Sequence, residues 1–358
     1  MAVLKFLSQS ILVALITVLA LEITLRIYAA FPRDADRYIH DEKIGYRARP
    51  NFPVHNGQTT NSGGFNDSEY AVKPRKGSVR LAIVGDSFVY GAVARKHNFT
   101  HVLEDLAQRN RVELEVLNMG ISAAGPRNYL GLIRQDVANS NVDIVAVTIF
   151  VGNDITQAHP HFKTSVWLNG TRETLAKPYL VGLSCEYSYV YRSIRSVARI
   201  ARERLDKTPR KSFTRENFMA IERQRSAVFK KDISRYVRDS YDGLLALIDE
   251  MSEEVKRQNG ELIVLLAPDE LQISEEIQHH LERRYQLDPL EYDFEQPQAI
   301  LGEALEARGI AYLDLLPFFQ EAQNGDELYI QYDTHWNEQG NRLAAEAIWR
   351  FLSSGFLL

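Results

Sequence analysis

The feature that most constrains the fold of this chain is the apolar run at residues 142–150, VDIVAVTIF. It is rich in β-branched residues and is almost wholly apolar. A strand of this composition has both faces buried, which is typical of a central strand in a parallel sheet covered by helices. The sequence therefore favours an α/β fold.

Further strands and helices are expected to alternate with this one. Shorter apolar runs predict strands at residues 79–84, 113–117, 261–267 and 310–315. Helical patterns cover residues 97–109, 126–139 and 337–352. Strands that alternate with helices predict a doubly wound α/β domain, with a mostly parallel five-stranded sheet in a flavodoxin-like three-layer arrangement. A composition of 45% apolar and 25% charged residues fits such a globular domain.

An apolar stretch at residues 6–31 precedes this pattern. As a helix it is long enough for a tilted bilayer crossing. Glu22 and Arg26 interrupt it, but their spacing lets them pair on one helix face. We therefore expect an uncleaved transmembrane helix. A cleavable signal peptide built on the uninterrupted run at residues 11–21 is the alternative.

The chain is expected to divide into three parts. Residues 1–31 are the anchor or signal segment, and residues 32–78 are a lead segment or linker rich in Pro, Gly, Asn and Arg. Residues 79–354 form the main domain, with a helical insertion at about residues 155–258. Within the insertion, residues 190–205 predict a basic amphipathic helix that carries Arg192, Arg195, Arg199 and Arg202. Its basic face is either solvated or in contact with anionic lipid headgroups or an acidic polysaccharide.

Charge and composition bound the partners and cofactors. A net charge of −5 gives no indication of a nucleic-acid partner. The single cysteine, Cys185, excludes an internal disulfide and a cysteine-based metal site. No Gly-rich phosphate loop follows the first strand, and no His-Glu-x-x-His motif is present. We expect neither a cofactor nor a metal ion.

Polar residues and glycines follow three of the expected strands. These strand ends read Gly85-Asp86-Ser87, Asn118-Met119-Gly120 and Gly152-Asn153-Asp154. The carboxyl ends of parallel strands meet at one edge of the sheet, where ligands bind in open α/β folds. A serine hydroxyl with converging N–H donors suits acyl transfer, because negative charge develops on the carbonyl oxygen. For Asp86 and Asp154, hydrogen bonds that brace their loops are favoured over a catalytic role.

One of the nine histidines is placed to serve as a base for the serine. His335 lies in the polar run Tyr332-Asp333-Thr334-His335-Trp336-Asn337, directly before the last expected helix. Asp333 can accept a hydrogen bond from one ring nitrogen while the other nitrogen faces Ser87. This arrangement would supply a nucleophile, a base and an orienting acid.

The order of these blocks resembles the SGNH/GDSL hydrolase superfamily over roughly residues 79–354. The resemblance implies an SGNH hydrolase-like fold in which Ser87 is the nucleophile, His335 the base and Asp333 the orienting acid. Asp333 precedes His335 by two residues, whereas the family often places this acid three residues before. The Asp-x-His-Trp pattern is similar to that of alginate-type O-acetyltransferases, which act on extracytoplasmic polysaccharides.

The resemblance also implies an oxyanion hole. Its donors would be the N–H of Ser87, the N–H of Ala123 and the side chain of Asn153. Ala123 stands where the family usually has glycine. Because the donor is a backbone N–H, alanine can still supply it.

Together with the N-terminal apolar stretch, the resemblance implies an ester hydrolase that acts outside the cytoplasm on O-acyl groups of a glycan or lipid, through an acyl-Ser87 intermediate. An O-acetyltransferase of a cell-surface polysaccharide would use the same residues. The third reading is an inactive, membrane-tethered carbohydrate-binding or scaffold partner of an acyltransferase. The expected partners are the acylated glycan or lipid, the membrane and a membrane-bound acyltransferase. The expected location is a single-pass membrane protein with a periplasmic or extracellular domain.

Overall fold

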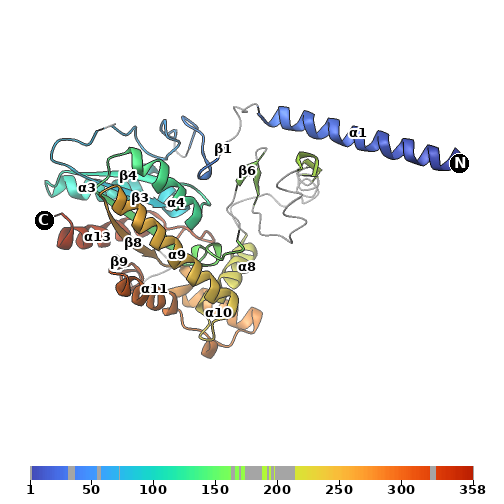
Figure 1. The fold of residues 1–358 in the computed structure, drawn as a ribbon. Helices are drawn as coiled ribbons and strands as arrows, with labels where there is room; N and C mark the ends of the chain where they lie inside the picture. Colours follow the sequence, from blue (N-terminus) through green and yellow to red (C-terminus); the bar gives the residue numbers. More distant parts are fainter. Residues whose placement is uncertain are drawn as a thin grey trace.

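The computed structural model describes residues 2–30, 37–54, 58–71, 73–162, 166–168, 171–173, 188–191, 193–194, 197, 214–322 and 328–357. Its centre is a five-stranded sheet with the order β4-β3-β5-β8-β9, in which every pairing is parallel (Figure 1). The strands are β3 (Val79–Gly85), β4 (Leu114–Gly120), β5 (Ile144–Phe150), β8 (Glu261–Ala267) and β9 (Ala311–Asp314). The predicted parallel five-stranded α/β fold is confirmed.

Helices cover both faces of the sheet, so the strands have two buried sides. In β5, Val145 and Val147 pack in one core, while Ile144 and Ala146 pack in the other. The first core is closed by α4 (Pro126–Gln135), α9 (Arg235–Arg257) and α11 (Gln296–Ala307). The second is closed by α3 (Phe99–Arg109), α12 (Leu316–Glu321) and α13 (Glu338–Gly355). This double burial explains why the strands read as continuous apolar runs.

Side-chain caps fix where two of these helices begin. The Asn98 side chain accepts a hydrogen bond from the Thr100 N–H at the start of α3. The Asn337 side chain accepts from the N–H groups of Gln339 and Gly340 at the start of α13. Asparagine is among the preferred N-cap residues because its side-chain oxygen satisfies otherwise unpaired N–H groups. The second cap sets the end of the loop that carries His335.

The described part of the lead segment packs against the main domain. It forms an antiparallel hairpin of β1 (Tyr38–Asp41) and β2 (Gly45–Ala48). Arg47 pairs with Asp136 at 3.1 Å, and the buried Tyr46 donates a hydrogen bond to the carbonyl oxygen of Ser122 at 3.0 Å. Residues of this segment therefore share a core with the sheet.

The segment between β5 and β8 contains α5 (Asp154–Gln157), the hairpin of β6 (Val166–Leu168) and β7 (Thr171–Glu173), α8 (Arg215–Arg225), η4 (Ser226–Phe229) and α9. Helix α9 packs against α4 and β8, so it is the layer helix that connects β5 to β8. The part that is additional to the layered domain therefore ends before α9. Arg192, Arg195, Arg199 and Arg202 of the expected basic helix lie outside the described residues.

The N-terminal helix α1 (Ala2–Ala30) projects away from the sheet domain (Figure 1). Residues Lys5–Ile27 are long and apolar enough to cross a membrane, by length and composition, and none of this window is buried within the protein. The expected pair forms, with Arg26 Nε 2.9 Å from Glu22 Oε1. The Glu22 carboxylate also accepts hydrogen bonds from the N–H groups of Tyr189 and Val190, at 2.9 and 3.0 Å. The N-terminal helix therefore contacts the segment inserted after β5.

Candidate active site

Ser87 lies at the turn between β3 and the short helix α2 (Ser87–Tyr90). Asp86 caps this helix by accepting a hydrogen bond from the Phe88 N–H at 2.9 Å. The neighbours of Ser87 in the chain are buried, whereas Ser87 itself is partly exposed. The turn thus holds the serine hydroxyl at the carboxyl edge of the sheet, where solvent and a substrate can reach it.

The end of β4 supports this turn from the side. A Cβ atom at Gly120 would overlap the backbone of Val89 and Tyr90, so only glycine allows β4 to approach α2 this closely. Asn118 donates a hydrogen bond from Nδ2 to the carbonyl oxygen of Val89 at 2.7 Å. The second sequence block therefore fixes the helix on which Ser87 lies.

Three of the expected site residues form one chain of hydrogen-bonded side chains. His335 Nε2 lies 2.7 Å from Ser87 Oγ, and His335 Nδ1 lies 2.5 Å from Asp333 Oδ1. Hydrogen bonds from the Asp333 N–H to the Ile330 carbonyl (2.8 Å) and from the Ile330 N–H to the His335 carbonyl (2.9 Å) hold their loop. The spacing of two residues therefore brings Asp333 against the imidazole.

Aromatic packing anchors the histidine loop. Trp336 is buried, and its ring lies 4.9 Å from that of Phe88 and 5.1 Å from that of Phe319, centroid to centroid. The Phe88 ring is also 5.3 Å from the His335 imidazole. The Trp336 side chain thus ties the residue after His335 to the helix that begins with Ser87.

The charge on Asp333 is stabilised by its partners. Burial alone would raise the pKa of this carboxyl group. Hydrogen bonds from the His335 ring and from the N–H groups of His335 and Thr334 outweigh burial and hold the pKa below its usual value. Asp333 is therefore an ionised acceptor that fixes the His335 ring through Nδ1.

The two remaining site residues flank Ser87 on neighbouring strand ends. Ala123 follows β4 and Asn153 follows β5, and these strands lie on either side of β3. In the described part of the chain, neither residue makes a hydrogen bond with Ser87. Ala123 has a φ of 64°, a left-handed conformation that favours glycine. The backbone here adopts a shape that suits the family's usual glycine.

Asp86 and Asp154 form a buried pair beneath the site. Asp154 accepts hydrogen bonds from the Phe150 N–H at 2.9 Å and from the Tyr129 hydroxyl at 3.0 Å. Burial raises the pKa of both carboxyl groups, and the proximity of Asp86 raises that of Asp154 further. Both side chains thus brace the loops that follow β3 and β5, as the sequence predicts.

Comparison with protein families gives a match over the C-terminal part of the chain. Residues 231–356 match the family model described as the SGNH hydrolase-like domain of the acetyltransferase AlgX. The match spans β8, Asp333 and His335, and it covers less than half of the chain. The chain carries an SGNH hydrolase-like domain. The resemblance to the SGNH/GDSL hydrolase superfamily is therefore confirmed.

Solved structures similar to the SGNH hydrolase-like domain include several esterases. One is the acetyl xylan esterase AlAXEase, with 12% identity and a TM-score of 0.44 over 76% of this chain and 100% of that chain. Another is a member of the lipolytic protein G-D-S-L family from Veillonella parvula, with 13% identity and a TM-score of 0.41 over 78% and 98%. No match was found among curated protein sequences.

A charged cluster that was not predicted from the sequence lies beside the site formed by Ser87, His335 and Asp333. Arg225, at the end of α8, pairs with the buried Glu222 at 3.0 Å and the buried Asp269 at 3.3 Å, and its guanidinium lies 5.0 Å from the centroid of the Phe150 ring. A Cβ atom at Gly152 would overlap the Asp269 carboxylate. Asp269 follows β8, so the strand-end rule that singled out Ser87 applies to it as well.

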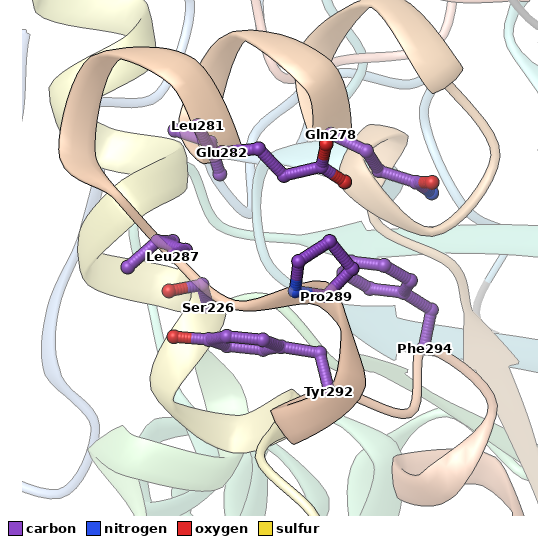
Figure 2. A pocket seen from close by; sticks show the side chains of 8 residues that line it. All are labelled: Ser226, Gln278, Leu281, Glu282, Leu287, Pro289, Tyr292 and Phe294. Atoms are coloured by element: carbon purple, nitrogen blue, oxygen red, sulfur yellow. The ribbon is translucent and has the colours of Figure 1, made fainter.

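Two hollows lie near the inserted helix α8 of the SGNH domain. Figure 2 shows the smaller, about 20 Å³, whose lining includes Leu281, Leu287, Pro289 and Phe294. This volume has room for about one water molecule and is too small for a substrate. The larger, about 310 Å³, includes Tyr332 in its lining. Among the described residues, no group of three or more His, Cys, Asp or Glu side chains is placed to hold a metal ion.

Proposed function

We propose that this protein is a serine-dependent acyl-ester hydrolase that works through an acyl-Ser87 intermediate. The observation that carries the proposal is the continuous contact from Ser87 Oγ through the His335 ring to Asp333. A serine hydroxyl is a weak nucleophile at its ordinary pKa, and an adjacent oriented base activates it. The match to an acetyltransferase domain supports the same class of chemistry.

In the proposed reaction, Ser87 Oγ attacks the ester carbonyl carbon while His335 Nε2 takes the hydroxyl proton. Asp333 stabilises the imidazolium that forms. The N–H groups of Ser87 and Ala123 and the Asn153 amide donate to the oxyanion. His335 then gives its proton to the departing alcohol, and the Ser87 acyl ester remains. Water attacks this ester, with His335 taking its proton and returning it to Ser87 Oγ as the acid leaves.

An O-acetyltransferase activity is the second candidate, and the family match favours it. A sugar hydroxyl would then replace water in the second step, and the same side chains would act. The acyl group would be delivered by a membrane-bound acyltransferase, and the product would be an acylated cell-surface polysaccharide. Helix α1 supports a location at the membrane. A polysaccharide acceptor at the cell surface would require the SGNH domain to lie outside the cytoplasm. Protease accessibility and the intact mass of the membrane fraction test this location and the retention of α1.

Product analysis with a small acyl ester tests both candidates. The purified full chain in detergent is given p-nitrophenyl acetate, with and without an oligosaccharide acceptor, and free acetate and acetylated sugar are measured. We expect Ser87→Ala to lower the release of p-nitrophenol by roughly 10³-fold or more. Free acetate identifies a hydrolase, and acetylated sugar identifies a transferase. A native protein that is folded yet releases no p-nitrophenol would favour the inactive carbohydrate-binding partner.

A further inference from the structure

The larger hollow adjoins the loop that carries Asp333 and His335. It is a cleft of about 310 Å³ between α8, the helix α10 (Glu275–Tyr285), the residues after β8 and the loop before α13. This volume is within the range of ligand pockets, about 300–1,000 Å³. Tyr332, which lines the cleft, directly precedes Asp333, and the Tyr329 hydroxyl ties the same loop to the carbonyl oxygen of Pro268 at 2.8 Å. A ligand in the cleft would therefore contact the loop that carries Asp333 and His335.

The conformation of Tyr332 is costly and points to a use for its side chain. Its φ is 56°, in the left-handed region. It occupies the third position of the turn closed by the bond from the Asp333 N–H to the Ile330 carbonyl, where glycine is the favoured residue. A bulky residue held in such a conformation is an indication of function. Its ring packs 6.3 Å from that of Phe218 on α8, so the inserted helix helps to orient it.

The chemistry of the lining favours a sugar over an acyl chain. Tyr332 supplies apolar surface, with the buried Phe218 and Ile277 behind the cleft wall, while Glu270, Glu276 and Gln331 supply polar groups. A hydrocarbon chain there would lie against carboxylates, which would lose hydration without gaining a hydrogen bond. A sugar ring offers both an apolar face for the tyrosine and hydroxyl donors for the carboxylates.

The charge of the cleft also selects among sugars. The described residues that line it include two glutamates and no Lys, Arg or His. Arg215 lies beside the cleft and pairs with Glu276 at 3.0 Å, so these two charges offset each other and Glu270 is the remaining carboxyl group of the lining. An anionic sugar would meet like charge here, whereas a neutral sugar would not.

We propose that this cleft binds a neutral sugar residue of the acylated or acceptor glycan, with Tyr332 as its packing surface. The proposal rests on the proposed acyl-ester chemistry and narrows its substrate from glycan or lipid to an uncharged glycan. Tyr332 is thus a specificity-determining residue, and the acyl transfer to Ser87 does not require it.

The test compares four esters with the full chain in detergent. They are p-nitrophenyl acetate, p-nitrophenyl decanoate, an O-acetylated cello-oligosaccharide and an O-acetylated oligogalacturonate. We expect Tyr332→Ala to lower kcat/KM for the cello-oligosaccharide by about tenfold or more, and for p-nitrophenyl acetate by less than about twofold. Tyr332→Phe retains the ring and should retain the activity. Tyr312→Ala, which removes a tyrosine outside the cleft lining, is the matched control.

A variant that changes the charge of the cleft separates an effect on sugar recognition from an effect on the structure of the loop. Glu276 is exposed, so Glu276→Lys should leave the fold intact. It should raise kcat/KM for the oligogalacturonate, relative to that for the cello-oligosaccharide, by about tenfold. The proposal is wrong if Tyr332→Ala lowers kcat/KM for p-nitrophenyl acetate and for the cello-oligosaccharide equally, or if it changes neither value. It is also wrong if p-nitrophenyl decanoate is the preferred ester and only its hydrolysis depends on Tyr332.

A binding measurement that needs no ester cleavage distinguishes failure of the sugar site from failure of the proposed hydrolase function. Unacetylated cello-oligosaccharide is titrated into the native chain and into Tyr332→Ala by calorimetry. Heat of binding that disappears in the variant supports the sugar site even if no ester is cleaved, in which case only the proposed hydrolase function fails. Ser87-dependent cleavage of p-nitrophenyl acetate without cello-oligosaccharide binding overturns the sugar site alone.

Discussion

His335 Nε2 lies 2.7 Å from Ser87 Oγ, although 248 positions separate the two residues in the chain. The fold brings them together, because Ser87 follows strand β3 of the sheet and His335 precedes α13, the helix that packs against α3. Asp333 completes the chain of contacts at His335 Nδ1. Because the three side chains act as a unit, substitution of any one of them tests the site.

Asp333→Asn should lower kcat by roughly 10²–10⁴-fold without unfolding the protein. Asparagine is nearly the same size, but it no longer supplies the negative charge that stabilises the imidazolium form of His335. The measurement is ester hydrolysis together with a thermal melt. Near-native activity in a folded variant would show that another group orients the histidine.

Ala123 should tolerate glycine and reject a branched residue. Its φ of 64° is strained for any L-residue and worse for a β-branched one. Ala123→Gly keeps the backbone N–H and should retain activity, whereas Ala123→Val should lose at least about 1–2 kcal/mol of unfolding free energy and much of the activity. Urea denaturation and ester hydrolysis measure the two effects. If Ala123→Gly and Ala123→Val were equally stable and equally active, the loop at Ala123 would not have this left-handed conformation.

Arg225→Ala should destabilise the fold by about 3 kcal/mol or more. The substitution leaves the buried carboxyl groups of Glu222 and Asp269 without their cation. Burial and the proximity of Asp269 already raise the pKa of Glu222 well above its usual value, which shows how poorly this environment supports negative charge. The urea midpoint of the full chain in detergent is the measurement. Arg235→Ala, which removes an exposed ion pair with Asp239, is the matched control and should change little. A loss no larger than that of the control would contradict the structural role of Arg225.

Asp67 should make stability fall as the pH rises from about 4 to about 6. Burial raises its pKa to about 6, and hydrogen bonds from Asn118 and Ser68 and the nearby Arg95 offset only part of this effect. The folded state then binds the proton more tightly than the unfolded chain, so raising the pH through this window favours unfolding. Relative to the native chain, the unfolding free energy of Asp67→Asn should increase by up to about 3 kcal/mol between pH 4 and pH 7. A difference in unfolding free energy that stays constant with pH would contradict this.

The strands and most site residues could be predicted because their signals are local. Runs buried on both faces read as continuous apolar segments, and the residues that follow them occupy one edge of a parallel sheet. Residues 261–267 were expected as a strand and form one with the same bounds. Because the carboxyl ends of parallel strands converge at one edge of the sheet, the strand positions then predicted that Ser87 and Asn153 lie at this edge.

The supporting contacts could not be predicted, because they join residues far apart in the chain. Tyr46 lies in a segment whose composition indicates an ordered lead segment or a linker. That composition does not predict that the Tyr46 hydroxyl donates a hydrogen bond to the carbonyl oxygen of Ser122, next to Ala123. Arg225 has the sequence context of a solvated helical arginine, but it reaches the Phe150 ring and the residue that follows β8. The left-handed turn at Tyr332 likewise carries no glycine or asparagine as a signal.

Covalent labelling with a fluorophosphonate probe tests the central claim most directly. The native chain is compared with Ser87→Ala and His335→Ala, and a thermal melt confirms that each is folded. Labelling of the native protein that disappears in Ser87→Ala and falls sharply in His335→Ala is the result this account predicts, because only an activated serine reacts. A folded native protein that is not labelled, or labelling that persists in Ser87→Ala, would contradict it.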